Sequence, residues 1–246
     1  MTERQPTLRL RRRPIKKKNY LFKSLFRVKS TNWLISKRDM EKDLFENYMS
    51  MHEISTASFQ KFLPGEWELK FITGEVEQIN DAFEQTFWAI HDLWHREPCN
   101  ILYTDPDTIA TKPIDIWDRY DQFRMFNFTA PNSYGKFANY FNAGVRYFAS
   151  TMDRAIWQTG ADMAHNWNKG NYNTEQIILN TMLWDQGLTL KEVLDPVMAW
   201  QGLGSGVNNR ECKMEDACIL HLHSSRGAKN RLQEMTRLAK SIGLDT

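Results

Sequence analysis

The sequence from Cys99 to Trp117, CNILYTDPDTIATKPIDIW, joins an apolar run to an acidic loop. Residues Asn100 to Thr104 indicate a buried strand, and Asp105 and Asp107 follow at its carboxyl end, where ligands bind in open α/β sheets. Two carboxylates one residue apart offer hard oxygen ligands to Mg²⁺ or Mn²⁺, ions that commonly share their coordination with substrate phosphates. Asp-Pro-Asp is also ordinary turn chemistry, since Asp bonds its own backbone and Pro presets φ. This stretch alone therefore leaves a cation site and a plain turn as alternatives.

Strands and helices alternate before this stretch. Apolar residues predict one strand over Asn19–Val28 and another over Trp67–Ile72. A helix is predicted to begin at Asp39, and a longer one over Glu75–His95 has an apolar residue at every third or fourth position. Strand, helix, strand, helix, strand is the pattern of a parallel sheet with right-handed crossovers. We therefore expect an α/β fold, a Rossmann-like domain with a central, mostly parallel sheet flanked by helices, with the acidic loop after its third strand.

The second half of the chain continues with further strands and helices. Strands are predicted over Phe123–Phe128, Tyr140–Phe148 and Ala217–His223. Helices are predicted over Met152–Trp167, over Glu175–Trp184, and from a cap at Ser224 or Ser225 towards Lys240. The sequence contains no internal repeat, so residues 19–246 are expected to form one domain.

Composition describes an ordinary globular protein. The 246 residues can bury one substantial core, or one core plus a small subdomain, and 41% hydrophobic with 25% charged residues is typical of such chains. No apolar run approaches the ~18 residues of a membrane span, and no signal peptide is visible, so we expect a cytosolic protein. Cys99, Cys212 and Cys218 lack zinc-like spacing and indicate reduced thiols. Nine Trp and 14 Phe mainly fill a core, and some can stack on sugars or bases.

Basic residues are concentrated at the start of the chain. Seven of them fall within ten positions, at Arg9, Arg11 to Arg13 and Lys16 to Lys18, although the net charge is only +2. We expect residues 1–18 to form a flexible basic arm. Such a run is usually solvated, and it can also grip the phosphates of nucleic acid or an anionic surface.

Four separate segments together point to one family. They are ILYTDPDTIATKPID from Ile101, YFNAGVRYF from Tyr140, EQIILN from Glu175 and ILHLHSSRGAK from Ile219. Each is weak alone, but in order and approximate spacing they resemble the acidic, Asn-containing, Asp-Gln and late His segments of glycosyltransferases with the A-type fold, especially the family 8 group. The resemblance covers roughly Asn19 to Lys229. It implies an A-type catalytic domain over residues 19–246 that transfers a hexose or pentose from a nucleotide sugar, a UDP-sugar being the expected donor.

The resemblance also implies a metal centre. Asp105 and Asp107 would bind Mn²⁺ or Mg²⁺, and a late histidine would complete the protein's share of the coordination. His221 and His223 are both candidates, because side chains two apart in a strand point the same way. Either one can instead be a structural histidine bonded to backbone.

The position of the phosphate-binding cation depends on which histidine sets the register. Counting from His223 places the family's lysine at Lys229, whereas counting from His221 places it at Gly227, beside Arg226. Both cations suit a diphosphate, and the arginine fork can donate two parallel bonds. We leave both open.

Four further residues are expected near the transferred sugar. The resemblance places Asn142 and Gly144 along it, with glycine allowing close backbone approach. Glu175 and Gln176 would face the sugar or the acceptor hydroxyl, with Asn142, Glu175 and Gln176 as the catalytic candidates. The Glu-Gln pair can equally be the capped first turn of a helix. Retention of the anomeric configuration would follow from the family likeness.

Several departures limit what the resemblance implies. Pro106 lies between the carboxylates where a small residue is commoner, Glu175 replaces Asp, and the Pro and aromatic that close the family's late segment are absent. The opening nucleotide-binding motif is also absent, so the donor's base and sugar stay open.

The acceptor is predicted from the basic arm and a narrower likeness. Short chains with these segments resemble glycosyltransferases of tailed bacteriophages, and in the T-even-like group such enzymes decorate hydroxymethylated DNA bases. DNA in the host cytoplasm is therefore the preferred acceptor. A saccharide or lipid-linked acceptor is the competing enzyme hypothesis. A non-catalytic binder of nucleic acid or glycan, and a metal-dependent nucleotidyltransferase or phosphohydrolase, are the alternatives outside this class. The sequence does not indicate an oligomeric state.

Overall fold

A computed structural model describes residues 17–29, 44–130, 139–167, 174–193, 195, 198–201, 213–223 and 227–245. Outside them lie most of the predicted basic arm, the predicted helix start at Asp39, the predicted cap at Ser224 or Ser225, and also Arg226 and Cys212.

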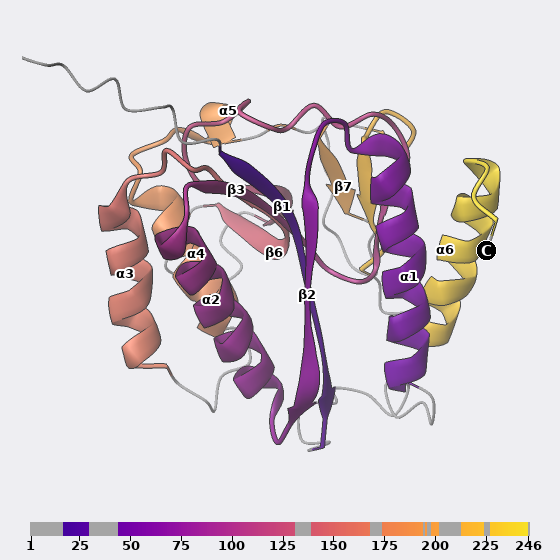
Figure 1. Ribbon diagram of the computed structural model, residues 1–246, viewed down its shortest axis with the longest axis horizontal. Helices are drawn as coiled ribbons and strands as arrows, with labels where there is room; N and C mark the ends of the chain where they lie inside the picture. The colour runs from indigo at the N-terminus through magenta and orange to yellow at the C-terminus, as the bar shows by residue number, and fades with distance from the viewer. Residues whose placement is uncertain are drawn as a thin grey trace, which may run out of the picture.

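The centre of the molecule is a five-stranded sheet in the order β2-β1-β3-β6-β5 (Figure 1). Its strands are β1 (Lys18–Val28), β2 (Glu68–Val76), β3 (Cys99–Thr104), β5 (Arg124–Ala130) and β6 (Tyr140–Phe148). β1 pairs in parallel with both β2 and β3, while β6 is antiparallel to β3 and to β5. β6 is therefore the one strand of this sheet that runs against the others, and the predicted α/β fold is confirmed with a mixed sheet.

A second, three-stranded sheet holds the end of the acidic stretch. It has the order β4-β8-β7, formed by β4 (Thr108–Ala110), β8 (Ile219–His221) and β7 (Ala199–Gln201). β8 confirms the predicted late strand, although it ends at His221. β4 and β7 were not predicted, since three residues are too short to show a period.

Helices cover both faces of the central sheet (Figure 1). α1 (Leu44–Phe62) and α6 (Ala228–Ser241) lie side by side on one face. The other face carries α2 (Ile79–Arg96), α3 (Arg154–His165) and α4 (Thr174–Trp184), and the short α5 is Leu190–Val193. α2 begins later than predicted because β2 continues to Val76. Among the described residues, none of these helices combines the length and apolar character needed to cross a bilayer.

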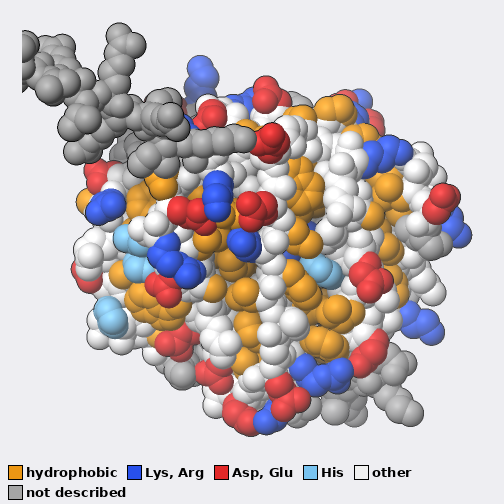
Figure 2. Space-filling model, in the orientation of Figure 1, with side chains coloured by type: hydrophobic (Ala, Val, Ile, Leu, Met, Phe, Trp, Pro, Cys, Tyr) orange, Lys and Arg blue, Asp and Glu red, His pale blue; other side chains and the backbone are white. Residues whose placement is uncertain are grey.

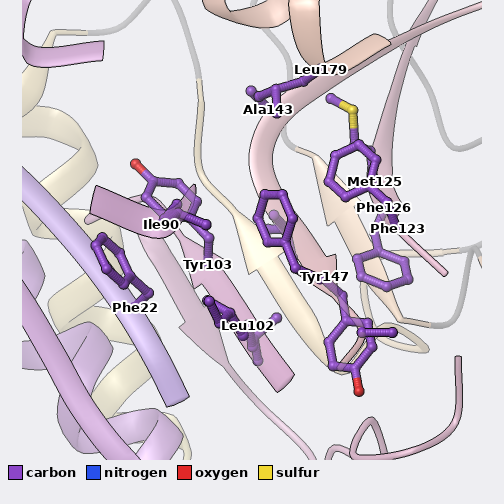
Figure 3. Packing of buried hydrophobic residues seen from close by; sticks show 14 of the residues in the cluster. Phe22, Ile90, Leu102, Tyr103, Phe123, Met125, Phe126, Ala143, Tyr147 and Leu179 are labelled. Atoms are coloured by element: carbon purple, nitrogen blue, oxygen red, sulfur yellow. The ribbon is translucent and has the colours of Figure 1, made fainter. Parts of the chain in front are cut away.

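The main core lies between the central sheet and α2, α3 and α4. Phe22 and Leu102 from the strands pack with Ile90 of α2, and Phe123 and Tyr147 continue the cluster (Figure 3). Each such large side chain stabilises the fold by about 1.5–3 kcal/mol when fully buried. The expectation that aromatics mainly fill the core is confirmed, since most of the largest fully buried side chains are aromatic.

A smaller apolar cluster fixes the second sheet against α1 and α6. Met51 of α1, Ile109 of β4, Leu220 of β8 and Met235 of α6 are all buried in it. On the face shown in Figure 2, acidic and basic side chains are interspersed with hydrophobic ones. Lys29 after β1 and Glu75 of β2 form an ion pair at 3.0 Å. The acidic loop, which joins β3 to β4, therefore connects the main core to this smaller cluster.

Candidate functional site

The Asp-Pro-Asp turn lies directly at the carboxyl end of β3. The amide of Asp105 donates to the carbonyl of Gly144 at 2.8 Å, and the Thr108 hydroxyl donates to the carbonyl of Asp105 at 2.6 Å. Asp107 is buried at 4% exposure, whereas the Asp105 side chain is 34% exposed. The stretch is thus a closed turn, as one alternative predicted, and it also presents two carboxylates, while the cation site stays a prediction.

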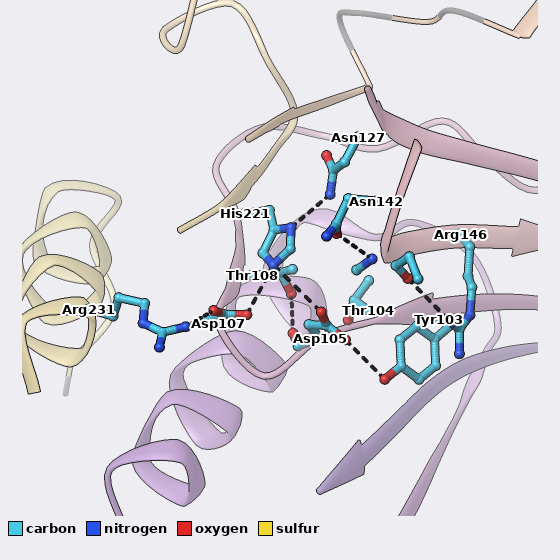
Figure 4. A network of polar contacts seen from close by, with 12 residues as sticks. Tyr103, Thr104, Asp105, Asp107, Thr108, Asn127, Asn142, Arg146, His221 and Arg231 are labelled. Carbon is cyan, nitrogen blue, oxygen red and sulfur yellow. Dashed lines mark hydrogen bonds and ion pairs between the residues drawn. The ribbon is translucent and has the colours of Figure 1, made fainter. Parts of the chain in front are cut away.

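Pairing of β4 with β8 brings the late histidine to these carboxylates. Thr108 is the strand partner of His221, whose Nε2 lies 3.2 Å from Oδ1 of Asp107 and 3.6 Å from Oδ2 of Asp105 (Figure 4). The ring of His223 is exposed and lies 5.6 Å from that of His221, centroid to centroid. The geometry therefore places His221 between the two carboxylates and His223 at the rim.

Electrostatics in this cluster favour an anionic Asp107. Burial by itself raises the pKa of Asp107, but the charges of His221 and Arg231 outweigh it and hold the pKa far below its usual range. Burial likewise opposes the charged form of His221, yet Asp107 and Asp105 raise the net pKa of that imidazole above its ordinary value. The pKa of His223 is lowered by desolvation and then by the charge of His221. The pKa values of the two histidines are therefore shifted in opposite directions.

Among the lysines and arginines of the described residues, Arg231 of α6 is the one that pairs with these carboxylates. Its guanidinium lies 2.7 Å from Oδ2 of Asp107 and 5.2 Å from the ring centre of Tyr48. Burial opposes the charge of Arg231, but Asp107 and then Tyr48 more than restore it, so its pKa is raised. The family resemblance predicts Arg226 or Lys229 for the phosphate-binding cation. Lys229 is exposed on the first turn of the same helix, and Arg226 lies outside the described residues.

A buried asparagine orients His221. The amide nitrogen of Asn127 lies 2.9 Å from Nδ1 of His221, and the amide oxygen is buried with no protein partner. If the amide group of Asn127 is flipped, its oxygen accepts a hydrogen bond from the Nδ1–H of His221. The lone pair of Nε2 then points towards the carboxylates. No motif or spacing marks Asn127, which lies opposite Asn142 on the neighbouring strand.

Gly144 allows the cluster to close. A Cβ added there would lie 2.7 Å from Oδ2 of Asp105 and closer still to the ring of His221. Its amide donates to Oδ1 of Asn142 at 2.8 Å. The side chains of Asp105 and His221 therefore leave no room for a Cβ, which explains the glycine at this position. The proposed contact of Asn142 and Gly144 with a sugar stays a prediction.

Glu175 is buried beneath the other side of the loop. Its Oε1 lies 2.7 Å from the guanidinium of Arg146, which stacks 3.8 Å from the ring centre of Tyr103. Tyr103 in turn donates to Oδ1 of Asp105 at 3.0 Å. Burial raises the pKa of Glu175 and the charge of Arg146 only partly offsets this. Glu175 thus reaches the site through Arg146 and Tyr103.

Gln176, beside Glu175, has a structural contact. Its side-chain oxygen accepts from the amide of Ala143 at 3.0 Å, which ties α4 to β6. The catalytic roles predicted for Gln176 and Glu175 remain predictions.

A fully buried lysine supports the loop from the opposite face of the sheet. Lys23 of β1 donates to the hydroxyls of Ser55 at 2.7 Å and Thr104 at 2.6 Å. Burial lowers the pKa of Lys23 to about 7, although Asp105 and Asp107 act to raise it. Its signal in the sequence was a lone cation inside the apolar run YLFKSLF, a position where lysine is rarely found without partners.

The donor set fits a divalent cation. Asp107, His221 and His223 each offer one ligand atom, and these atoms lie within 4.8 Å of one another. Asp105 adds an oxygen 3.6 Å from His221. Carboxylate oxygens with imidazole suit Mn²⁺, and a mainly oxygen set with open positions for water and phosphate suits Mg²⁺. Three of the four predicted ligands, Asp107, His221 and His223, thus form one candidate centre among the described residues, and Asp105 lies beside it next to His221.

Comparison with solved structures defines the class of fold. The galactosyltransferase LgtC, solved with donor and acceptor sugar analogues, is 14% identical to this chain, with 92% of this chain and 97% of that chain covered and a TM-score of 0.51. The chain therefore has the A-type glycosyltransferase fold, and identity this low shows the fold alone. A glycosyltransferase involved in glycosylation of the major capsid of PBCV-1 is also 14% identical, over 89% of this chain and 99% of that chain, but its TM-score of 0.44 carries no argument.

Sequence comparisons do not place the chain in a family. No protein-family model matches it. Cytochrome P450 71B23 of Arabidopsis thaliana is 27% identical over 117 residues, which are 46% of this chain. The chain spans only 23% of that protein's length, and a match of this extent shows no shared family.

Proposed function

We propose that this protein is a metal-dependent glycosyltransferase that moves a sugar from a nucleotide-sugar donor to an acceptor hydroxyl. One observation carries the proposal: Asp105, Asp107 and His221 converge at the carboxyl end of β3 in an A-type glycosyltransferase fold. That edge of an α/β sheet is where ligands bind. A domain that only binds nucleic acid or glycan has no need of these groups together.

The chemistry follows from the charges at the site. Transfer places negative charge on the diphosphate that leaves, and Mn²⁺ or Mg²⁺, when bound, neutralises it as a Lewis acid. Asp105, Asp107 and His221 would hold that ion, with His223 at the rim. Asp107 is already ionised in the fold, because its pKa is held far below the usual range despite burial. The carboxylate is therefore ready to bind a cation at neutral pH.

The sugar-facing roles rest on the neighbours of the carboxylates. Asn142 bonds Gly144 at the edge of the cluster and offers an amide dipole towards a developing sugar cation. Glu175 and Gln176 are proposed to face the sugar or the acceptor hydroxyl, and Glu175 to serve the transfer step more than donor binding. A UDP-sugar as donor and retention at the anomeric carbon complete the proposal, and both rest on the family 8 resemblance.

For the acceptor we propose hydroxymethylated bases of duplex DNA. The support is the basic run of the N-terminal arm together with the likeness to phage enzymes. The structure limits the arm's reach: Lys17 pairs with Asp118 at 3.1 Å, and Lys18 pairs with Glu97 at 2.9 Å as it begins β1. The cations left for phosphates are then those of residues 1–16, ahead of the catalytic domain.

The test compares acceptors under conditions where the donor is turned over. Labelled sugar transfer to hydroxymethylcytosine duplex is measured against unmodified duplex, each at two salt concentrations. The affinity for DNA should fall with salt with a logarithmic slope of about −0.9 per phosphate contact, and deletion of residues 1–16 should flatten it. This deletion keeps Lys17 and Lys18 and should leave donor hydrolysis intact. Transfer to neither duplex, with unchanged DNA binding by the truncated protein, would move the acceptor to saccharides or lipid-linked sugars.

A further inference from the structure

Both oxygens of Asp107 face protein side chains. Oδ1 faces Nε2 of His221 at 3.2 Å and Oδ2 faces the guanidinium of Arg231 at 2.7 Å. A carboxylate binds a divalent ion through oxygen lone pairs, and Arg231 holds those of Oδ2. A cation that binds Asp107 through both oxygens therefore competes with Arg231 for Oδ2.

Arg231 contacts both Asp107 and Tyr48 in a largely buried environment. Its side chain is only 11% exposed, it lies over the ring of Tyr48, and its Nε is buried with no hydrogen-bond partner. A guanidinium in such surroundings needs an anion, because its charge is poorly solvated. Released from Asp107, it would need another oxyanion, and the planar arginine fork matches a phosphate with two parallel bonds.

We propose that Arg231 couples cation binding to donor binding at this centre. Without a cation, Arg231 neutralises Asp107. When Asp107 binds a cation instead, Arg231 is released and binds the diphosphate of the donor. Each ligand therefore raises the affinity of the protein for the other by the same factor. The inference rests on the proposed function, since it names how that site takes up a nucleoside diphosphate. It also names a phosphate-binding residue, Arg231 of α6, that neither alignment of the late segment, from His221 or from His223, predicted.

The test measures binding of Mn²⁺ alone and of UDP by calorimetry, in the wild-type protein and in Arg231→Met. Loss of the competitor should tighten Mn²⁺ binding without nucleotide by about fivefold or more. UDP affinity in saturating Mn²⁺ should weaken by at least tenfold, because the phosphate loses its fork. These opposite signs are not expected from a general loss of structure, which weakens both. Arg231→Lys, which keeps the charge but not the fork, should show both effects at reduced size and serves if Arg231→Met does not fold.

A matched control lies on the same helix. Arg237 is exposed and pairs with Glu234 at 2.6 Å, so Arg237→Met should leave both affinities unchanged. Weaker or unchanged Mn²⁺ binding in both Arg231 variants, with normal binding in the wild type, overturns this inference alone. Absence of Mn²⁺ binding in the wild-type protein overturns the metal centre itself, and the inference with it.

Discussion

Replacing Gly144 with alanine should damage the metal centre more than the fold. The added Cβ would lie 2.7 Å from Oδ2 of Asp105, where an ordinary contact begins at 3.4 Å, so that carboxylate must retreat by about 0.7 Å. The ring of His221 lies closer still and must also move. Overpacking of this kind costs about 1–3 kcal/mol. Metal centres tolerate shifts of only about 0.2 Å in ligand distance, so we expect Mn²⁺ affinity to fall about tenfold or more.

The assay pairs a Mn²⁺ titration with thermal unfolding. Each kcal/mol should lower the Tm by about 2–4 °C for a domain of this size. Gly74→Ala is the control, because a Cβ at that strand position meets the ring of Phe26 at 3.5 Å, an ordinary contact. Gly144→Ala with wild-type Mn²⁺ affinity would refute the close approach of Asp105 and His221 and the site built on it.

Three more predictions concern the two late histidines, Glu175 and His52. His221→Ala should abolish Mn²⁺ binding while His223→Ala weakens it, since only His221 lies between both carboxylates; equal effects in the same titration would contradict this order. Glu175→Gln should lower turnover at unchanged donor affinity and also destabilise the fold by about 3 kcal/mol in urea unfolding, because it leaves Arg146 buried without its ion partner; unaltered turnover would return Glu175 to a structural role. Burial, and then the charge of Lys23, lowers the pKa of His52 to about 4. Between pH 6.5 and 4 the unfolded chain therefore binds a proton at His52 that the folded protein does not bind. Stability should then fall by up to about 3 kcal/mol as pH drops through that window, and His52→Gln should flatten the loss seen in urea unfolding at each pH; an unchanged pH profile would argue against a neutral buried His52.

The elements that position the site were accessible from the sequence where they carry a clear period. The apolar alternation of β1 and the three-to-four-residue repeat of α2 gave their type and approximate bounds. The acidic loop was placed correctly after the third strand, because chain order fixes which strand ends in Asp105. Local patterns thus supplied the scaffold and the carboxylates.

The contacts that complete the site join residues far apart in the chain. Arg231 meets Asp107 across 124 positions, and nothing in the sequence of α6 marks that arginine over its neighbours. Short β4 was hidden inside what looked like a turn, although its pairing with β8 is what brings His221 into place. Tertiary pairing decides these contacts, and propensity or spacing does not encode it.

Turnover of nucleotide sugars tests the central claim most directly. The wild-type protein and Asp107→Ala are incubated with a panel of nucleotide sugars, with Mn²⁺ and after chelation, and mass spectrometry follows release of the nucleoside diphosphate. Our account predicts release from at least one donor by the wild-type protein, dependent on Mn²⁺ and lost in Asp107→Ala. Removal of that carboxylate forfeits several kcal/mol of transition-state stabilisation from the cation. Absence of hydrolysis or binding with every donor, or equal turnover by Asp107→Ala, would contradict it.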